Sequence, residues 1–193
     1  ECIGSGGFAF VYRVIRQPDK SEFAMKVCPH EALENQLFKA KHFDEIKIQS
    51  KLKHPNIVQL EQNWTDMDNT YIVMELCKNG SVSRLLKRRG KLTEPETAMI
   101  MKQVVEAVKF CHESQVIHRD LKLDNFLFSD GNNTVKITDF GISEEVSVKK
   151  KDIVFAGTPQ YMGPEVVGLK EYGYQVDIWA IGVCTFELLT GHR

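Results

Sequence analysis

The pattern of apolar and polar positions changes near residue 80 of the chain. Before this point, short apolar segments rich in β-branched residues alternate with polar turns, which is typical of strands. The predicted strands are residues 11–16, 23–27, 57–60 and 71–76. A single segment, 31–52, is rich in Glu, Lys, Leu and Gln and predicts a helix that ends before Pro55.

After residue 80 the pattern favours helices. Residues 81–89 can form a short helix, and Thr93 followed by Glu-Pro-Glu is a typical helix N-terminus. The apolar residues that follow repeat at intervals of three and four, up to Cys111. A hairpin is predicted at 126–138, followed by a long polar loop at 142–163 that contains a short basic run. A helix from Asp177 should be buried because it is apolar nearly all round.

Composition limits the class of protein. The chain has 193 residues, of which 42% are hydrophobic and 26% are charged, as expected for one or two soluble globular domains. A net charge of −1 gives no reason to expect nucleic acid or an anionic membrane as a partner. We find no membrane segment and no signal peptide.

Five cysteines without a C-x-x-C pair predict reduced thiols, and hence a cytoplasmic or nuclear protein. The first residues run straight into a glycine-rich stretch, and the last follow an apolar segment. We therefore expect both ends of the chain to be cut.

The stretch 118–125, His-Arg-Asp-Leu-Lys-Leu-Asp-Asn, carries the clearest chemistry. The carboxylate of Asp120 can accept a proton from a hydroxyl nucleophile, and the amide oxygen of Asn125 can help to hold a hard metal ion. Lys122 lies between them and can neutralise a phosphoryl group in transit. A charged loop between two strands would also be polar, but it explains neither the order nor the spacing.

A second carboxylate follows the predicted hairpin, in Asp139-Phe140-Gly141. Mg²⁺ prefers a few oxygen ligands together with phosphate oxygens and water. Asp139 near Asn125 would complete such a site, and Gly141 allows the backbone to swing there.

Residues 4–11 fit the pattern G-x-G-x-x-(G)-x-V, with Ala9 in the third glycine position. Glycines in such a loop let backbone amides approach phosphates. A strand follows the loop, whereas a dinucleotide-binding enzyme would have a helix there, so we exclude that class.

Lys26 lies within the apolar strand 23–27 and needs a partner or a ligand if it is buried. The spacing between Val11 and Lys26 favours a Lys26 that binds a ligand over a Lys26 that faces solvent. We choose Glu45 as its partner because of the position of Glu45 relative to the His-Pro-Asn at 54–56. The alternative is that Glu45 is one of several solvated glutamates on its helix.

Together these motifs resemble the catalytic domain of eukaryotic protein kinases over essentially the whole chain. Lys122 and Thr158 are similar to the serine/threonine type, and the glycine loop is similar to the Polo and Aurora groups. The resemblance implies an α+β, bilobal fold with an antiparallel sheet and one helix in a small lobe (1–76). A hinge (77–80) would join it to a mainly helical large lobe (81–193) that lacks its last helices.

The resemblance also assigns roles. Asp120 would orient the substrate hydroxyl and accept its proton, Lys122 would steady the γ-phosphate, and Asn125 and Asp139 would hold Mg²⁺. The residues expected to bind ATP are Ile3, Gly4, Gly6, Gly7, Val11, Ala24, Lys26, Glu45, Met74, Glu75, Cys77 and Leu127. The residues of a spine coupling the lobes are Gln49, Leu60, His118 and Phe140, anchored by Asp177.

The implied function is transfer of the ATP γ-phosphate to Ser or Thr hydroxyls of protein substrates. The alternatives are a nucleotide-binding pseudokinase and a fragment that does not fold by itself. The sequence shows no degeneration, because Lys26, Glu45, Asp120, Asn125 and Asp139 are all present. Ala-Pro-Glu of the family is Gly163-Pro164-Glu165 here, and the arginine that pairs with this glutamate in the family lies beyond the chain.

Regulation and specificity give two further hypotheses. Arg119 beside Asp120 is typical of kinases in which an added phosphate orders the loop, yet residues 152–156 contain no hydroxyl. Either Asp152 partly substitutes for a phosphate or Ser147 is phosphorylated. Asp124 and Glu187 could favour basic residues before the target hydroxyl.

Overall fold

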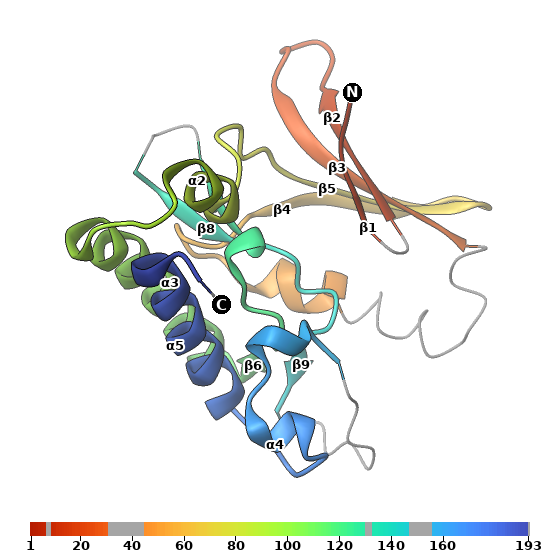
Figure 1. Ribbon diagram of the computed structural model, residues 1–193. Coiled ribbons are helices and arrows are strands. Elements are labelled where there is room, and N and C mark those ends of the chain that lie inside the picture. Colours follow the sequence, from red (N-terminus) through yellow and green to blue (C-terminus); the bar gives the residue numbers. More distant parts are fainter. Residues whose placement is uncertain (7–8, 31–44, 130–132, 147–155, 193) are drawn as a thin grey trace.

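A computed structural model describes residues 1–6, 9–30, 45–129, 133–146 and 156–192 (Figure 1). Its N-terminal part is an antiparallel sheet in the order β1-β2-β3-β5-β4. The five strands are β1 (Cys2–Gly6), β2 (Ala9–Ile15), β3 (Glu22–Pro29), β4 (Leu60–Thr65) and β5 (Asn69–Glu75). Of the helix predicted at 31–52, residues 45–51 are described and are helical, and residues 31–44 lie outside the described part.

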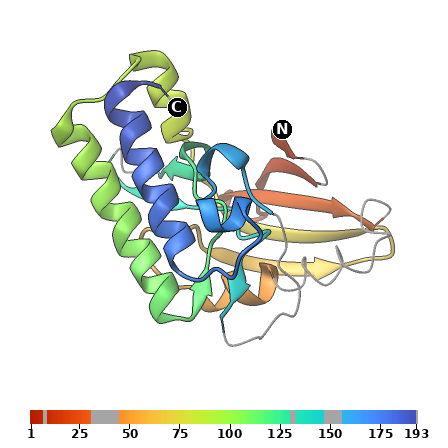
Figure 2. The ribbon, with the colours of Figure 1, turned by 60° about the horizontal axis from the view of Figure 1, so that its bottom comes forward.

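The rest of the described chain is mainly helical. Its helices are α2 (Val82–Arg89), α3 (Glu94–Glu113), α4 (Pro164–Val167) and α5 (Gln175–Thr190), with single 3₁₀ turns η2 (Leu123–Asn125) and η3 (Pro159–Tyr161). Two short antiparallel strand pairs complete it, β6 (Val116–Ile117) with β9 (Glu144–Glu145) and β7 (Phe126–Phe128) with β8 (Val135–Ile137). Figure 2 shows α3 and α5 lying side by side. The α+β class is confirmed, while the bounds of the two lobes stay a prediction.

The N-terminus of α3 forms as its sequence predicts. The Thr93 hydroxyl accepts a hydrogen bond from the Glu96 amide, and the Glu96 carboxylate accepts one from the Thr93 amide at 2.9 Å. This reciprocal pair satisfies two backbone donors that a helix start leaves free. The apolar stripe of α3, which includes Ile100, Val104 and Cys111, is buried in the main core.

The prediction of a strand at residues 57–60 is wrong, since β4 begins only at Leu60. Ile57 and Val58 are buried, but their backbone joins β8 of the helical part. The actual strand is polar and mostly exposed because β4 lies at the edge of the sheet. An apolar run therefore marked burial here and did not mark strand pairing.

The last helix is also more exposed than its composition predicts. Ile178, Trp179 and Phe186 on α5 are 58%, 49% and 56% exposed, whereas Asp177 and Cys184 are fully buried. The long polar segment 142–163 likewise contains more structure than a loop, because β9 and η3 lie within it. Residues 147–155 of that segment lie outside the described part.

Two sets of hydrogen bonds are among the contacts that link the sheet to the helical part. In the first, the Val58 amide donates to the Ile137 carbonyl at 2.9 Å, and the Ile137 amide donates to the Asn56 carbonyl at 2.8 Å. In the second, the Asn79 side-chain amide donates to the Ser129 carbonyl at 2.7 Å. A hinge at 77–80 stays a prediction. Residues 56–58 form a further connection between the sheet and the helical part.

No helix among the described residues is long and apolar enough to cross a membrane. None of the five cysteines forms a disulfide, and Cys28, Cys111 and Cys184 are buried.

Cys111 should make the folded protein less stable as pH rises into the alkaline range. Burial, together with the charge of Asp177, raises the pKa of the Cys111 thiol to about 12. The unfolded thiol ionises near pH 8.5, so above this pH the unfolded state binds fewer protons than the folded state. We therefore expect the stability that Cys111 contributes to fall by up to about 1.4 kcal/mol per pH unit as pH rises from about 9 toward 12.

Urea denaturation of the wild type and of Cys111→Ala at pH 8, 9 and 10 measures this effect. The stability difference between the two proteins should change in favour of the variant as pH rises. Parallel stability curves would show that the thiol titrates normally in the folded protein.

Candidate active site

The loop that carries Asp120 is held by the buried carboxylate of Asp177. Its Oδ2 accepts a hydrogen bond from the His118 amide at 2.9 Å, and its Oδ1 accepts one from the Arg119 amide at 2.9 Å. His112 Nε2 lies 2.8 Å from the same carboxylate. His112 is therefore a third partner of Asp177. The Arg119 backbone has a φ of 72°, which costs free energy for a residue with a side chain.

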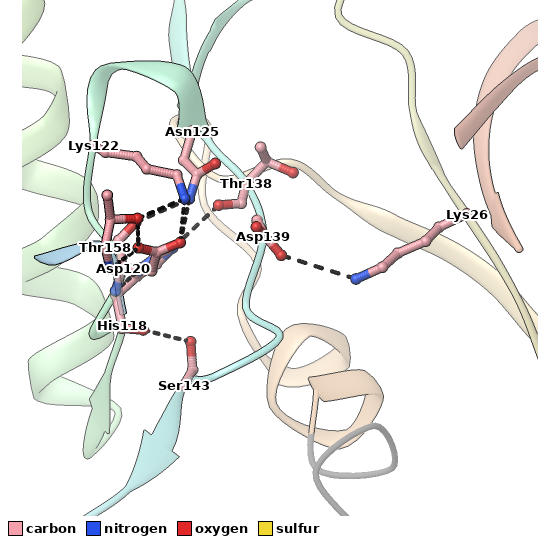
Figure 3. Close-up of polar contacts among 9 residues, drawn as sticks. All are labelled: Lys26, His118, Asp120, Lys122, Asn125, Thr138, Asp139, Ser143 and Thr158. Carbon is pink, nitrogen blue, oxygen red and sulfur yellow. Dashed lines mark hydrogen bonds and ion pairs between the residues drawn. The ribbon is translucent and has the colours of Figure 1, made fainter. Parts of the chain in front are cut away.

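The Asp120 carboxylate accepts hydrogen bonds on both oxygens. Oδ1 accepts from the Thr158 hydroxyl at 2.7 Å and from the Thr158 amide at 3.0 Å. Oδ2 accepts from Lys122 Nζ at 2.6 Å, and Lys122 also donates to the Thr158 hydroxyl at 2.9 Å. Figure 3 shows these three side chains pointing toward one another. A carboxylate held in this way is oriented to accept a proton from a hydroxyl placed beside it.

Asn125 closes the other side of this cluster. Its side-chain nitrogen donates to the Asp120 carbonyl at 2.9 Å and lies 3.4 Å from Asp120 Oδ2. Because the nitrogen is used in this way, the amide oxygen of Asn125 is directed away from Asp120. The three predicted catalytic residues, Asp120, Lys122 and Asn125, therefore lie together.

Lys26 pairs with Glu45, as predicted. The Lys26 Nζ lies 2.6 Å from Glu45 Oε1 and 3.9 Å from Asp139 Oδ1. Burial alone would lower the pKa of Lys26, but the Glu45 and Asp139 carboxylates outweigh it and raise the pKa. Lys26 is therefore a fixed cation. Asp139 lies between Lys26 and the Asp120 cluster (Figure 3).

One face of the sheet brings together the other predicted nucleotide contacts. Val11 is opposite Lys26 on neighbouring strands, and Ala24 is opposite Met74, and directly opposed residues share a face. Met74 lies in an apolar cluster with Val58, Leu60, Cys77 and Leu127. The sheet thus places a cation beside an apolar surface, as a nucleotide requires.

The remaining residues predicted to contact the nucleotide differ in exposure and in their partners. Ile3 is 47% exposed in β1, which also contains Gly4 and Gly6, while Gly7 lies outside the described residues. The Glu75 carboxylate lies 2.8 Å from Lys136 Nζ. The Glu75 side chain is therefore already engaged in an ion pair.

Two residues of the predicted spine, His118 and Phe140, are in contact, and the rest of the spine stays a prediction. The rings of His118 and Phe140 are 4.8 Å apart, and His118 Nε2 donates to the Thr138 carbonyl at 3.1 Å. Gln49 donates to the Val58 carbonyl at 3.1 Å. His118 is 1% exposed and hydrogen bonded, which suits a structural residue better than a base.

Of the two acidic residues predicted to favour basic substrates, Asp124 is exposed and Glu187 is buried. Because Glu187 Oε2 also accepts a hydrogen bond from the Tyr161 hydroxyl at 2.6 Å, Glu187 is poorly placed to meet a substrate. Ser147 and Asp152 lie outside the described residues. The sequence did not indicate that Thr158 binds Asp120, although Thr158 was noted as similar to the serine/threonine type.

The chain matches the family model described as "Protein kinase domain" over residues 1–193. The fold, the Asp120 cluster and the Lys26–Glu45 pair agree with this match, and the chain belongs to the protein kinase family.

Among curated proteins, the chain is 40% identical to the cell cycle serine/threonine-protein kinase CDC5/MSD2 of Saccharomyces cerevisiae, over 98% of this chain and 27% of that protein. It is 39% identical to the serine/threonine-protein kinase polo of Drosophila melanogaster, over 97% of this chain and 33% of that protein. It is 40% identical to the serine/threonine-protein kinase PLK1 of Xenopus laevis, over 98% of this chain and 32% of that protein. The chain thus spans a third or less of the length of these relatives, and of the two groups expected, Polo is the one supported.

Proposed function

We propose that the protein transfers the γ-phosphate of ATP to Ser or Thr hydroxyls of protein substrates. The observation that carries this proposal is the cluster in which Lys122 and Thr158 orient the Asp120 carboxylate. A tyrosine acceptor is disfavoured, because the relatives of this chain are named serine/threonine-protein kinases.

The chain's own groups divide the work. Lys26, fixed by Glu45, binds the α- and β-phosphates, and the apolar cluster around Met74 receives the adenine. Asp120 orients the substrate hydroxyl and accepts its proton, while Lys122 neutralises charge on the phosphate as it moves. Little covalent chemistry is required, so positioning and electrostatics supply the rate.

The donor set suits Mg²⁺. The described residues contain no group of three or more His, Cys, Asp and Glu side chains that could hold a metal ion. Asn125 and Asp139 together offer hard oxygen ligands, and Mg²⁺ commonly takes one or two carboxylates with phosphate oxygens and water. We propose that these two residues hold Mg²⁺, which when bound neutralises phosphate charge.

Nucleotide binding should stabilise the fold. At about 100 times its dissociation constant, Mg·ATP should stabilise the protein by roughly 2.7 kcal/mol, which raises the melting temperature by roughly 5–11 °C for a chain of this size. Asp139→Ala should melt with the same cooperativity and gain clearly less from Mg·ATP. Thermal melting with and without Mg·ATP measures both effects.

The outcomes separate the alternatives. A cooperative melt that nucleotide does not shift would contradict the proposed ATP site. Stabilisation by Mg·ATP without transfer to any protein substrate would identify a nucleotide-binding pseudokinase. A chain without a cooperative melt would not be an independent domain, and the activity would then belong to a longer protein.

A further inference from the structure

Two consecutive glutamates on β9, Glu144 and Glu145, connect the catalytic loop to the helical segment 45–51. We propose that this acidic pair positions both elements for catalysis, so that the protein needs no added phosphate. The proposal rests on the proposed kinase function and makes Glu144 and Glu145 positioning residues.

Glu144 is the anionic partner of Arg119. Its Oε2 forms an ion pair with the Arg119 guanidinium and accepts a hydrogen bond from the Tyr172 hydroxyl at 3.3 Å. The guanidinium also lies 5.1 Å from the centre of the Tyr172 ring. The side chains of Arg119 and Glu144 are only 7% and 13% exposed. Removing one charge from such a buried pair leaves the other without compensation, which is strongly unfavourable.

The backbone fixes Glu144 in this place. β9 pairs with β6, so that Glu144 lies opposite Ile117, two residues before Arg119. The Ser143 hydroxyl donates to the His118 carbonyl at 3.1 Å (Figure 3). The carboxylate is therefore supplied by an ordered strand that borders the catalytic loop directly.

Glu145 reaches in the other direction. Its carboxylate lies 2.7 Å from Lys51 Nζ and 3.7 Å from Lys47 Nζ, and both lysines belong to the segment that carries Glu45. Glu45 in turn holds Lys26. The lysines are more than half exposed, so these pairs contribute little stability, but they set where the segment lies against β9.

An added phosphate would act in the same place. Phosphorylation orders a loop by giving an arginine a new anionic partner, and Glu144 already provides one for Arg119. Between Gly141 and Gly157 the sequence has two hydroxyl side chains, Ser143 and Ser147. Ser143 is buried and hydrogen bonded, and Ser147 lies outside the described residues. Among the described residues, Arg119 therefore has an anionic partner without any modification.

The test compares unphosphorylated proteins. Wild type, Ser147→Ala, Glu144→Gln and Glu113→Gln are purified with a phosphatase, checked by mass spectrometry, and assayed for kcat and for the KM of ATP. Glu113→Gln is the matched control, since it removes an exposed ion pair with Lys109 on α3. We expect Ser147→Ala to match the wild type, and phosphorylation of the wild type to change kcat by less than about twofold. Glu144→Gln should lose about tenfold or more in kcat, equivalent to about 1.4 kcal/mol, with little change in the KM of ATP.

A charge reversal tests the second half of the pair. Glu145→Lys should lower kcat by a smaller factor, and the additional change Lys51→Glu should restore part of the loss. If Glu144→Gln does not fold, this reversal carries the test, because the Lys51 side chain is 55% exposed and the double variant restores an ion pair of opposite sign.

Hydrogen exchange gives a readout that does not depend on transfer. The amides of Arg119 and Thr158 should exchange faster in Glu144→Gln than in Glu113→Gln. A wild type that transfers no more phosphate than Asp120→Asn would sink the proposed function, while the exchange comparison would still decide the role of Glu144.

Two results would overturn the inference. One is a wild type that gains about tenfold or more in kcat on phosphorylation. The other is a Glu144→Gln protein that matches Glu113→Gln in both kcat and exchange.

Discussion

Asp120→Asn should abolish nearly all phosphate transfer while leaving the fold intact. The substituted amide can still accept hydrogen bonds from Thr158, but it cannot take the proton of the substrate hydroxyl. Loss of a positioned base lowers rates by roughly 10²- to 10⁴-fold, and we expect the decrease in kcat to lie in this range. The measurement is transfer of labelled phosphate to a protein substrate under saturating Mg·ATP.

Asp68→Asn is the matched control for this variant. It makes the same chemical change at an exposed position in the turn between β4 and β5, and its activity should equal that of the wild type. Asp120→Asn should also keep its thermal stabilisation by Mg·ATP, since Asp120 is not among the residues proposed to bind nucleotide. Residual activity within about tenfold of the wild type, below the range for a lost base, would show that Asp120 is not the proton acceptor.

Asp177→Ala should cause the largest loss of stability. The substitution removes a fully buried carboxylate that accepts from the amides of His118 and Arg119 and contacts His112. Each buried donor left without a partner costs roughly 1–3 kcal/mol. We therefore expect the free energy of unfolding to fall by roughly 3–5 kcal/mol, a large share of a typical total of about 5–15 kcal/mol.

Urea denaturation of Asp177→Ala measures this loss, and Asp68→Ala provides the exposed control. Any variant that remains folded should also transfer phosphate more slowly, because the Arg119 backbone, with its φ of 72°, loses what holds it beside Asp120. A loss of less than about 1 kcal/mol, the least that one unpaired donor costs, would mean that another group satisfies the two amides.

The sequence predicted well those features that depend on local pattern. The N-terminal cap of α3 and the hairpin of β7 and β8 follow from short-range chemistry. The pairing of Lys26 with Glu45 was also predicted, because the distance from Glu45 to Pro55 selects one glutamate among several.

Other features depend on distant parts of the chain. Thr158 is 38 residues from Asp120, and no periodicity connects them. The two glutamates of β9 look like part of a polar loop until β6 pairs with them. The edge strand β4 has no alternating pattern because most of its side chains are exposed. Helix α5 has several large apolar side chains exposed although its sequence is mostly apolar.

If the sheet rotated against the helical part, the two sets of hydrogen bonds described above would lie near the axis. One connection joins Val58 to β8, the other joins Asn79 to Ser129, and the apolar cluster of Val58, Met74, Cys77 and Leu127 spans the interval between them. Residues near an axis move little, whereas residues far from it sweep wide arcs. Such a rotation would therefore leave the apolar cluster around Met74 nearly unchanged and separate Lys26 from Asp139. Opening would release the phosphate end of a bound nucleotide before its base.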